Sequence, residues 1–466
     1  MGRLLAILFF CLSCGPGLRD GEQHSHGLAD GLYYQIRVDG ELTRMWVRTC
    51  FDGQPPRRLY PMSSRAIDLL VEAYGEQGQE LRVNDEGVID LERLGAGECA
   101  QYEIDLERAG WSRHAVRRDR DLMLTQALFM WRPDEWDPEI QIAVEFDVPS
   151  DVHVSNGWPR DDRGIYHPER SVLHTVGNVA FLRREPMRFQ HLYTEVEIAR
   201  LAGALDASDA VLREWVEEAI RSAATLYGKF HKSRLHVAVV PVGPSFRPVA
   251  FGLVRRGGGP SVMLLVHENA DDDSLVRDWT ATHEFTHLGL PRMYSEDRWL
   301  AEGFATYYQE VLRARSGLIT PEQAWGALAR GFERGRFRGT RRPLWEDSLG
   351  FRSVGRIYWA GTAYMLDADI RLRQNGTSLD RAIEAFQARW QHTKTAWHGR
   401  RVMRGLDIVL GEDVTADLAE EYGSMRRYPD TDALLAQLGV SLGPDGNAVF
   451  DDSAPLAEIR RAITAR

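Results

Sequence analysis

The chain has 466 residues, of which 44% are hydrophobic, 27% charged and 10% aromatic. This composition excludes a disordered, a collagen-like or a multi-span membrane protein, and the length suits about two to four domains of roughly 100–200 residues each. With 57 basic and 68 acidic residues the net charge is −11, which argues against a general nucleic-acid-binding protein.

Residues 1–14 are typical of a secretion signal. Arg3 supplies a positive charge, residues 4–12 form an apolar run too short to span a bilayer, and small residues follow. Residues 11–14 also resemble a bacterial lipobox with Cys14 as the lipidated residue, although Cys11 stands where an aliphatic residue is usual. Lipidation and simple cleavage are both left open. Either predicts an exported protein, in the periplasm or anchored to the outer membrane of a bacterium, without a transmembrane helix in the mature chain.

The polar, glycine-rich residues 15–31 predict a tether after this signal. The four cysteines are too few for a disulfide scaffold and wrongly spaced for a cysteine-based zinc module. In an oxidising compartment Cys50 and Cys99 could pair. Two buried free thiols are the alternative, and the sequence leaves both open.

Residues 32–198 predict an antiparallel, sandwich-like β-rich domain. β-Branched and aromatic residues are frequent there, and turn signals recur. The expected strands are 33–38, 43–50, 140–148 and 179–184. A helix is expected over 64–75, where apolar residues recur near helical spacing.

The pattern changes near residue 200. Residues 207–229 carry an apolar stripe at helical spacing, with Ser208 or Asp209 as the N-cap. Strands are expected at 234–242 and 261–267, and helices from 272 onward, separated by glycine-rich breaks at 317, 331–339 and 376. We therefore expect an α+β multidomain protein in which the β-rich domain precedes a second domain over 199–425. Its C-terminal lobe is mainly helical, and residues 426–466 form a tail.

The most informative segment reads His-Glu-Phe-Thr-His over 283–287, within a single helix expected from 273 to 290. On a helix His283 and His287 share one face, so both imidazoles can bind one metal ion. Glu284 is rotated by about 100° and can act as the general base toward a metal-bound water. A chance match occurs in roughly a few per cent of such sequences, so a third ligand is needed.

Glu302 is the candidate third ligand. Apolar residues surround it within 299–304, which suggests burial, and a buried carboxylate needs a partner such as a metal ion. Two histidines and a glutamate leave the fourth tetrahedral position to water, as in catalytic zinc sites. The sequence therefore predicts one Zn²⁺ bound by His283, His287 and Glu302. The alternative for Glu302 is an exposed glutamate on the surface of a helix.

Three segments, HEFTH (283–287), WLAEGFATYY (299–308) and residues 356–383, together resemble the gluzincin metallopeptidases. They are most similar to the M61 (glycyl aminopeptidase) family, with the M1 aminopeptidases as relatives. The resemblance covers about residues 200–420 and implies a thermolysin-like catalytic domain. It also implies that Tyr358 stabilises the developing oxyanion, with Tyr364 as the second choice and a packing role as the alternative.

The chain departs from these families at several positions. Val254 stands where they carry a glutamate that binds a peptide amino terminus, so aminopeptidase and endopeptidase action are both left open. Ala360 stands where a lysine is usual, and the 14 residues between His287 and Glu302 form a shorter loop than in either family. The PDZ domain common in M61 proteins is not expected in this chain.

Other charged and titratable groups have weaker claims to function. Residues 331–342 carry five arginines, which form either a solvated basic loop or a rim that binds acidic peptide groups. Four further histidines lack a helical ligand pair and are expected to be structural: His231, His236, His267 and His398.

The sequence thus predicts an exported zinc-dependent metallopeptidase that cleaves peptides or proteins with a Glu284-activated water. A catalytically weak or inactive relative that serves as an envelope binding or scaffold protein is the main alternative. A hydrolase of non-peptide amides is a third.

Overall fold

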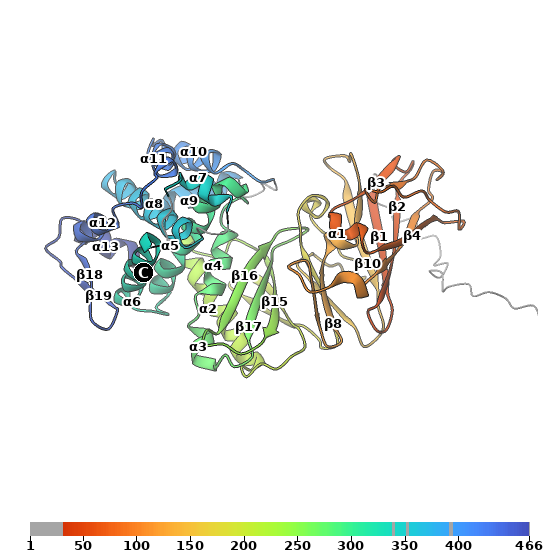
Figure 1. Cartoon of the computed structure of the whole chain (residues 1–466), viewed down its shortest axis with the longest axis horizontal. Helices are drawn as coiled ribbons and strands as arrows, with labels where there is room; N and C mark the ends of the chain where they lie inside the picture. Colours follow the sequence, from red (N-terminus) through yellow and green to blue (C-terminus); the bar gives the residue numbers. More distant parts are fainter. Residues whose placement is uncertain (1–30, 338–340, 351–353, 391–394, 466) are drawn as a thin grey trace, which may run out of the picture.

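The computed structural model describes residues 31–337, 341–350, 354–390 and 395–465. The predicted signal, the candidate lipidation site Cys14 and almost all of the tether lie outside the described residues. Figure 1 shows a β-rich unit at one end, a sheet with helices in the middle and a helical lobe at the other end. This arrangement confirms the predicted α+β multidomain fold.

The N-terminal unit is built from a five-stranded sheet of order β10-β1-β2-β6-β4, a four-stranded sheet of order β11-β12-β8-β7 and a three-stranded sheet of order β5-β3-β9. Their strands are β1 (Gly31–Val38), β2 (Arg44–Phe51), β3 (Arg58–Pro61), β4 (Leu70–Gly75), β5 (Ile89–Asp90), β6 (Ala100–Asp105), β7 (Ala115–Arg118), β8 (Asp121–Thr125), β9 (Trp131–Pro133), β10 (Gln141–Asp147), β11 (His153–Asn156) and β12 (Asn178–Leu182). Pairing is antiparallel except between β1 and β10, which run parallel. In β1 every second residue from Leu32 to Val38 is buried, as expected for a strand with one face on a core.

The helix predicted over 64–75 is wrong. Only α1 (Ser64–Ile67) is helical, and β4 follows it. β4 pairs antiparallel with β6, with Ala73 opposite Tyr102. Pairing with a neighbouring strand therefore overrides the local helical spacing of the apolar residues.

Cys50 and Cys99 form a disulfide, so the structure favours this alternative over two free thiols. Cys50 lies in β2, and Cys99 comes directly before β6. β2 and β6 are neighbours in the sheet, and Thr49 pairs with Ala100. The bridge therefore reinforces an existing strand pair.

The central sheet has the order β13-β14-β15-β17-β16. Its strands are β13 (Met187–His191), β14 (Thr194–Arg200), β15 (Arg234–Val242), β16 (Val249–Arg255) and β17 (Ser261–His267). β14, β15 and β17 are parallel, whereas β13 and β16 are antiparallel edge strands. The sheet therefore takes two strands from the segment before residue 199. Helix α2 (Asp209–Tyr227) begins at the predicted N-cap Ser208.

The single helix predicted over 273–290 is also wrong, because two helices occupy this stretch. α3 (Asp272–Val276) is capped by Asp271, and α4 (Thr280–His287) follows after a break. The Asp278 carboxylate accepts a hydrogen bond from the backbone N–H of Thr280 at 2.7 Å and so satisfies the first turn of α4. The second helix thus begins three residues before His283.

The C-terminal lobe is mainly helical, as predicted. Its helices are α5 (Arg298–Ser316), α6 (Pro321–Phe337), α7 (Leu344–Ser348), α8 (Val354–Gln374), α9 (Leu379–Trp390), α10 (Gly399–Leu410), α11 (Thr415–Ser424), α12 (Thr431–Leu438) and α13 (Ala457–Thr464). A small hairpin, β18 (Val440–Leu442) and β19 (Ala448–Phe450), packs beside α6.

The predicted break at 331–339 is wrong, because α6 continues through Phe337. A Cβ added to Gly331 would overlap the indole of Trp359 of α8, and a Cβ added to Gly335 would overlap the Cβ of Trp359 and the side chain of Tyr428. These glycines therefore permit close packing and do not end the helix. The first arginines of this segment are helical too, and the Arg334 guanidinium lies 5.1 Å from the centre of the Trp359 ring. Residues 338–340 lie outside the described part.

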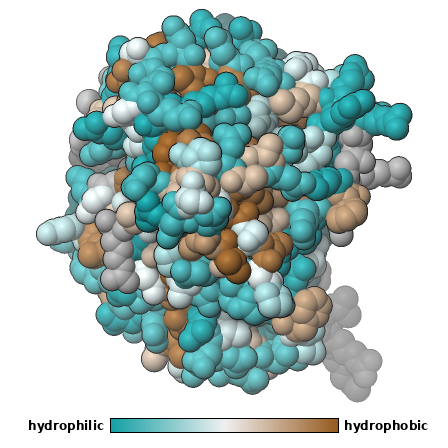
Figure 2. All heavy atoms as spheres, turned by 90° about the vertical axis from the view of Figure 1, so that its left-hand side faces the viewer, coloured by the Kyte–Doolittle hydropathy of each residue, from teal (hydrophilic) through white to brown (hydrophobic). Residues whose placement is uncertain are grey.

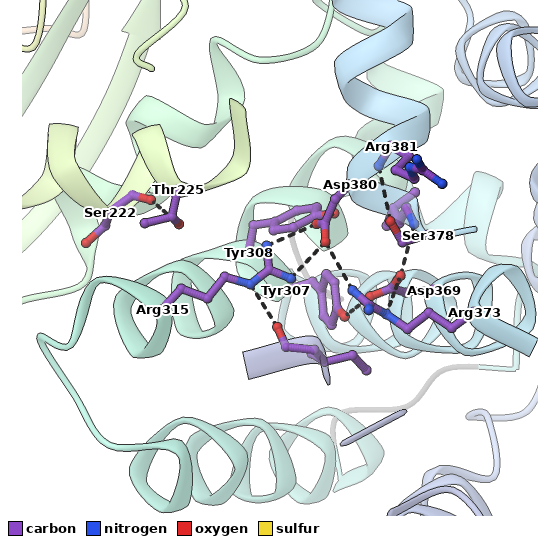
Figure 3. Close-up of polar contacts among 12 residues, drawn as sticks. Ser222, Thr225, Tyr307, Tyr308, Arg315, Asp369, Arg373, Ser378, Asp380 and Arg381 are labelled. Carbon is purple, nitrogen blue, oxygen red and sulfur yellow. Dashed lines mark hydrogen bonds and ion pairs between the residues drawn. The ribbon is translucent and has the colours of Figure 1, made fainter. Parts of the chain in front are cut away.

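A buried polar network ties α5, α8 and α9 together (Figure 3). The Asp369 carboxylate accepts hydrogen bonds from Tyr307 of α5 at 2.8 Å and from Arg373 at 3.0 Å. Asp380 of α9 pairs with Arg315 of α5 at 2.9 Å. The network fixes the helix that carries Glu302 relative to the helix that carries Tyr358.

Among the described residues, no helix is both long and apolar enough to cross a membrane. Figure 2 shows the helical end of the molecule, which is mostly hydrophilic with small groups of apolar side chains. Such exposed apolar groups are ordinary for a folded protein, so they do not by themselves mark a docking surface.

Candidate active site

Three side chains converge where α4 meets α5. His283 and His287 lie one turn apart on α4, and Glu302 lies in the first turns of α5. The Nε2 atoms of the two histidines are 3.2 Å apart. The Oε2 atom of Glu302 lies 3.3 Å from Nε2 of His283 and 3.4 Å from Nε2 of His287. The structure therefore brings together all three predicted metal ligands.

The spacing of these three atoms fits a tetrahedral zinc site. With metal–ligand bonds of about 2.0–2.1 Å, the edges of a tetrahedron are about 3.3–3.4 Å long. The measured separations of 3.2, 3.3 and 3.4 Å match one triangular face of such a tetrahedron. Nitrogen and oxygen donors of this kind suit Zn²⁺, and the fourth corner is left to water or substrate.

Gln309 orients the first histidine. Its Oε1 atom lies 2.8 Å from Nδ1 of His283, so the amide oxygen accepts the Nδ1 hydrogen and leaves the Nε2 lone pair for a metal. The Gln309 amide in turn donates to Glu310 at 2.8 Å, and Arg313 donates to Glu310 at 3.1 Å. All three supporting residues lie on α5, the helix that also carries Glu302.

The carboxylate of Glu302 and the neighbouring imidazoles shift one another's pKa. Burial raises the pKa of Glu302, but the charge of His287 and hydrogen bonds with both histidines outweigh this and hold it well below its usual range. Burial lowers the pKa of His283, but its hydrogen bond with Glu302 and the charge of Glu284 raise it overall. The site therefore keeps an ionised carboxylate next to the imidazoles, as a metal site requires.

Glu284 is 7% exposed and lies on the side of α4 that faces the edge strand β16. A Cβ added to Gly252 of β16 would lie only 2.6 Å from Oε1 of Glu284, so the glycine makes room for this carboxylate. Burial is the main cause that raises the pKa of Glu284, although the two histidines oppose it. A raised pKa suits a group that must accept and then release a proton.

Tyr358 of α8 lies beside the three ligands. Its ring is parallel to the His283 imidazole, with ring centres 6.1 Å apart. Burial raises its pKa far above the usual value, and the charge of Glu302 and a hydrogen bond with it add to the effect. The phenol therefore stays protonated and keeps its hydrogen for donation.

The second-choice tyrosine, Tyr364, has a different environment. It is fully buried, and its hydroxyl donates to the carbonyl of Thr415 at 2.8 Å. Its ring packs against Trp299. This side chain holds the helical core together and does not face the three ligands.

The two substituted positions and the shortened loop that depart from the related families are compatible with the assembled site. Val254 packs against the apolar core under the central sheet, and Ala360 is buried in α8. The short loop between His287 and Glu302 still lets α4 and α5 meet.

The four histidines expected to be structural lie away from the three ligands. His236 is fully buried between Ser155 and Ser261, and His267 bonds the carbonyl of Gly243. His398 is exposed, with Nδ1 3.4 Å from Glu296. Burial lowers the pKa of His231 to about 3, so it is neutral at physiological pH.

Sequence reasoning missed Gln309, Gly252 and Arg256. Gln309 follows Glu302 by seven residues, which is two helical turns, so the heptad spacing could have placed it on the same face. Gly252 and Arg256 lie beside α4 only because β16 packs against that helix. No local pattern shows this contact.

Comparison with known proteins supports the same interpretation. The model of the M61 glycyl aminopeptidase family matches residues 290–348, a segment that contains Glu302 but neither histidine. A search of curated sequences gives no significant match.

The fold resembles that of solved M1-type structures. An aminopeptidase N family protein from Idiomarina loihiensis aligns with a TM-score of 0.70 and 15% identity, over 88% of this chain and 79% of that one. An M1 zinc metallopeptidase variant from Deinococcus radiodurans, bound to a Tyr-Ser-Ala substrate, aligns with a TM-score of 0.55 and 14% identity, over 87% of this chain and 96% of that one. The family-model match confirms the predicted M61-like resemblance within residues 290–348, and the solved M1-type structures share the fold of this chain.

Proposed function

We propose that this chain is a zinc-dependent peptidase in which His283, His287 and Glu302 hold a single metal ion. The observation that carries the proposal is the triangle of donor atoms with sides of 3.2–3.4 Å. Zinc bound there supplies a Lewis acid that polarises a carbonyl and makes water more acidic. The remaining chemistry belongs to residues of the chain.

Glu284 is proposed as the general base. Its buried carboxylate lies next to the ligands and can take a proton from water and return it to the leaving amine. Tyr358 is proposed to donate a hydrogen bond to the oxyanion that develops when the peptide carbonyl is attacked. Both roles need the protonation behaviour described above: a carboxylate with a raised pKa and a phenol that stays protonated.

The test compares wild type with Glu284→Gln on a peptide library, with and without a chelator, while zinc content is measured. We expect hydrolysis to fall by about 10²–10⁴-fold in Glu284→Gln while zinc is retained. Normal hydrolysis by this variant would overturn the mechanism. Stoichiometric zinc without turnover in the wild type would favour the inactive binding or scaffold protein, which the departures at Val254 and Ala360 motivate.

We also propose that the protein is exported. The Cys50–Cys99 disulfide supports this, because disulfides persist in oxidising compartments and are rare in the cytosol. Cell fractionation with mass spectrometry of the mature amino terminus tests it. A chain that begins at an acylated Cys14 would establish the lipoprotein form, whereas a cytosolic chain with intact residues 1–14 would contradict export.

A further inference from the structure

A cavity with a cationic lining lies next to the proposed catalytic site. Its volume is about 170 Å³, and residues 288–292 form part of its wall, directly after the metal ligand His287. Helix α9 contributes Phe386, Gln387 and Trp390, and the N-terminal unit contributes residues 169–175. The cavity therefore lies where three parts of the molecule meet.

Lys232 is the most unusual residue of this wall. The chain contains only three lysines among its 57 basic residues, and this one lines the cavity just before β15. Within the described ranges its ammonium group forms no hydrogen bond or ion pair. Burial lowers its pKa to about 8, so it is still mostly protonated at neutral pH. The charge of Glu169 offsets only part of this effect. A cation without a hydrogen-bonded or ion-paired partner is costly to bury, and an anionic ligand would reduce the cost.

Arg256 links the cavity to the catalytic helix. It follows β16, and its guanidinium donates to the carbonyl of His287 at 2.6 Å and to that of Leu290 at 3.4 Å. Both acceptors are neutral, so these bonds orient the guanidinium without cancelling its charge. Its charge also acts on Glu284, where it opposes part of the rise in pKa that burial causes.

The charge balance of the lining is positive. Lys232, Arg256 and the exposed Arg292 are cationic, whereas Glu169 is the only acid among the described lining residues. Three positive groups and one negative group leave an excess of two positive charges. A cavity of about 150 Å³ holds a benzene molecule, so this cavity has room for the end of an aspartyl or glutamyl side chain.

We propose that this cavity binds a carboxylate of the peptide substrate, so that the enzyme prefers substrates with an acidic group close to the bond it cleaves. The proposal rests on the proposed peptidase function. It assigns Lys232 to direct contact with the carboxylate, and it assigns Arg256 to the wall between that group and His287. The carboxylate can belong to an acidic side chain or to the end of the peptide.

Binding is measured on zinc-loaded Glu284→Gln protein, so that peptides stay intact. The probes are peptides with an amidated end that differ only by Glu or Gln at one position, scanned along the peptide. A neutral peptide with a free carboxyl end forms the second arm. We expect the Glu peptide to bind at least tenfold more tightly than the Gln peptide at one position, or the neutral peptide with a free carboxyl end to bind at least tenfold more tightly than its amidated form.

Lys232→Met should bring the ratio of the affinities for the acidic and the neutral peptide close to one. Lys232→Glu should make the protein prefer basic peptides. Lys229→Met is the matched control, because Lys229 is exposed and does not line the cavity. Removal of an unpaired charge should leave the unfolding temperature of Lys232→Met equal to or above that of the wild type. A structural lysine would lower it.

The outcomes separate this inference from the function on which it rests. Equal binding of every acidic and neutral pair, or an unchanged preference in Lys232→Met, overturns the carboxylate site even when the wild type hydrolyses peptides. A Lys232-dependent acidic preference without hydrolysis by the wild type overturns the peptidase function and leaves the carboxylate site established.

Discussion

Gly303 of α5 and Gly361 of α8 touch backbone to backbone. A Cβ on Gly303 would overlap the backbone of Gly361, and a Cβ on Gly361 would overlap the carbonyl of Trp299. This contact lies one residue after Glu302 and three residues after Tyr358. The two glycines therefore set how closely the helix with the third metal ligand approaches the helix with the proposed oxyanion donor.

Gly303→Ala should push α5 and α8 apart. Forcing an extra carbon into a well-packed core costs typically about 1–3 kcal/mol, so the free energy of unfolding should fall by that amount. The affinity for zinc should fall as well, because Glu302 moves relative to the two histidines. Thermal unfolding and zinc competition with a chelator measure the two effects.

The matched control for this prediction is Gly243→Ala, since a Cβ at Gly243 meets nothing within 4 Å. That variant should unfold and bind zinc as the wild type does. If Gly303→Ala also keeps wild-type stability and zinc affinity, the close contact of the two helices does not position Glu302.

Gln309→Leu should weaken zinc binding without removing a ligand. The substitution takes away the acceptor for Nδ1 of His283, and loss of such a supporting hydrogen bond typically costs about 10–100-fold in metal affinity. Gln309→Glu keeps an acceptor and should retain most of the affinity. Equal zinc affinity in Gln309→Leu and the wild type would show that the amide does not orient the histidine.

Much of the ligand set could be predicted from sequence because it depends on local geometry. The i, i+4 spacing places His283 and His287 on one face of any helix, whatever the rest of the fold does. Apolar neighbours marked Glu302 as buried before its partners were known. Frequent β-branched and aromatic residues likewise predicted β1, β2, β10 and β12 within a few residues.

The remaining features depend on contacts between distant segments. The glycines at 331 and 335 suggested a helix break, but they accommodate Trp359 of α8, which no local pattern reveals. Arg256 acquires its place beside His287 only through the packing of β16 on α4. The break before α4 is accompanied by a hydrogen bond from the Thr280 N–H to Asp278, which the otherwise continuous helical pattern does not reveal.

Removal of the disulfide should destabilise the N-terminal unit. The bridge closes a loop with a sequence separation of 49 residues, for which the chain-entropy model gives about 4 kcal/mol. Replacing both cysteines by Cys50→Ser and Cys99→Ser should lower the free energy of unfolding by this amount and lower the unfolding temperature accordingly. Zinc content at a temperature where both proteins are folded should stay the same, because neither cysteine lies near the three ligands. Identical unfolding of wild type with and without reductant, with reduction checked by mass, would contradict the prediction.

His236 should make stability depend on pH. The imidazole is fully buried where β15 meets the N-terminal unit, with Nε2 3.1 Å from Ser155 and Nδ1 2.8 Å from Ser261. Burial lowers its pKa from 6.5 to about 4, although the charge of Glu197 opposes the shift. The folded state therefore favours the neutral ring. Its contribution is fully present above pH 6.5 and is lost as the pH falls toward about 4.

This loss can reach about 3 kcal/mol, since each pKa unit corresponds to about 1.4 kcal/mol. The free energy of unfolding of wild type and of His236→Gln is measured between pH 7.5 and about 4. Because the two proteins share all other titrating groups, the difference between them gives the contribution of His236. The difference between the two proteins should shrink as the pH falls, since only the wild type loses this contribution. His153→Gln, on the same strand as Ser155, is the control for the loss of a neighbouring histidine side chain. Parallel curves for wild type and His236→Gln would show that the buried imidazole does not set the acid sensitivity of this interface.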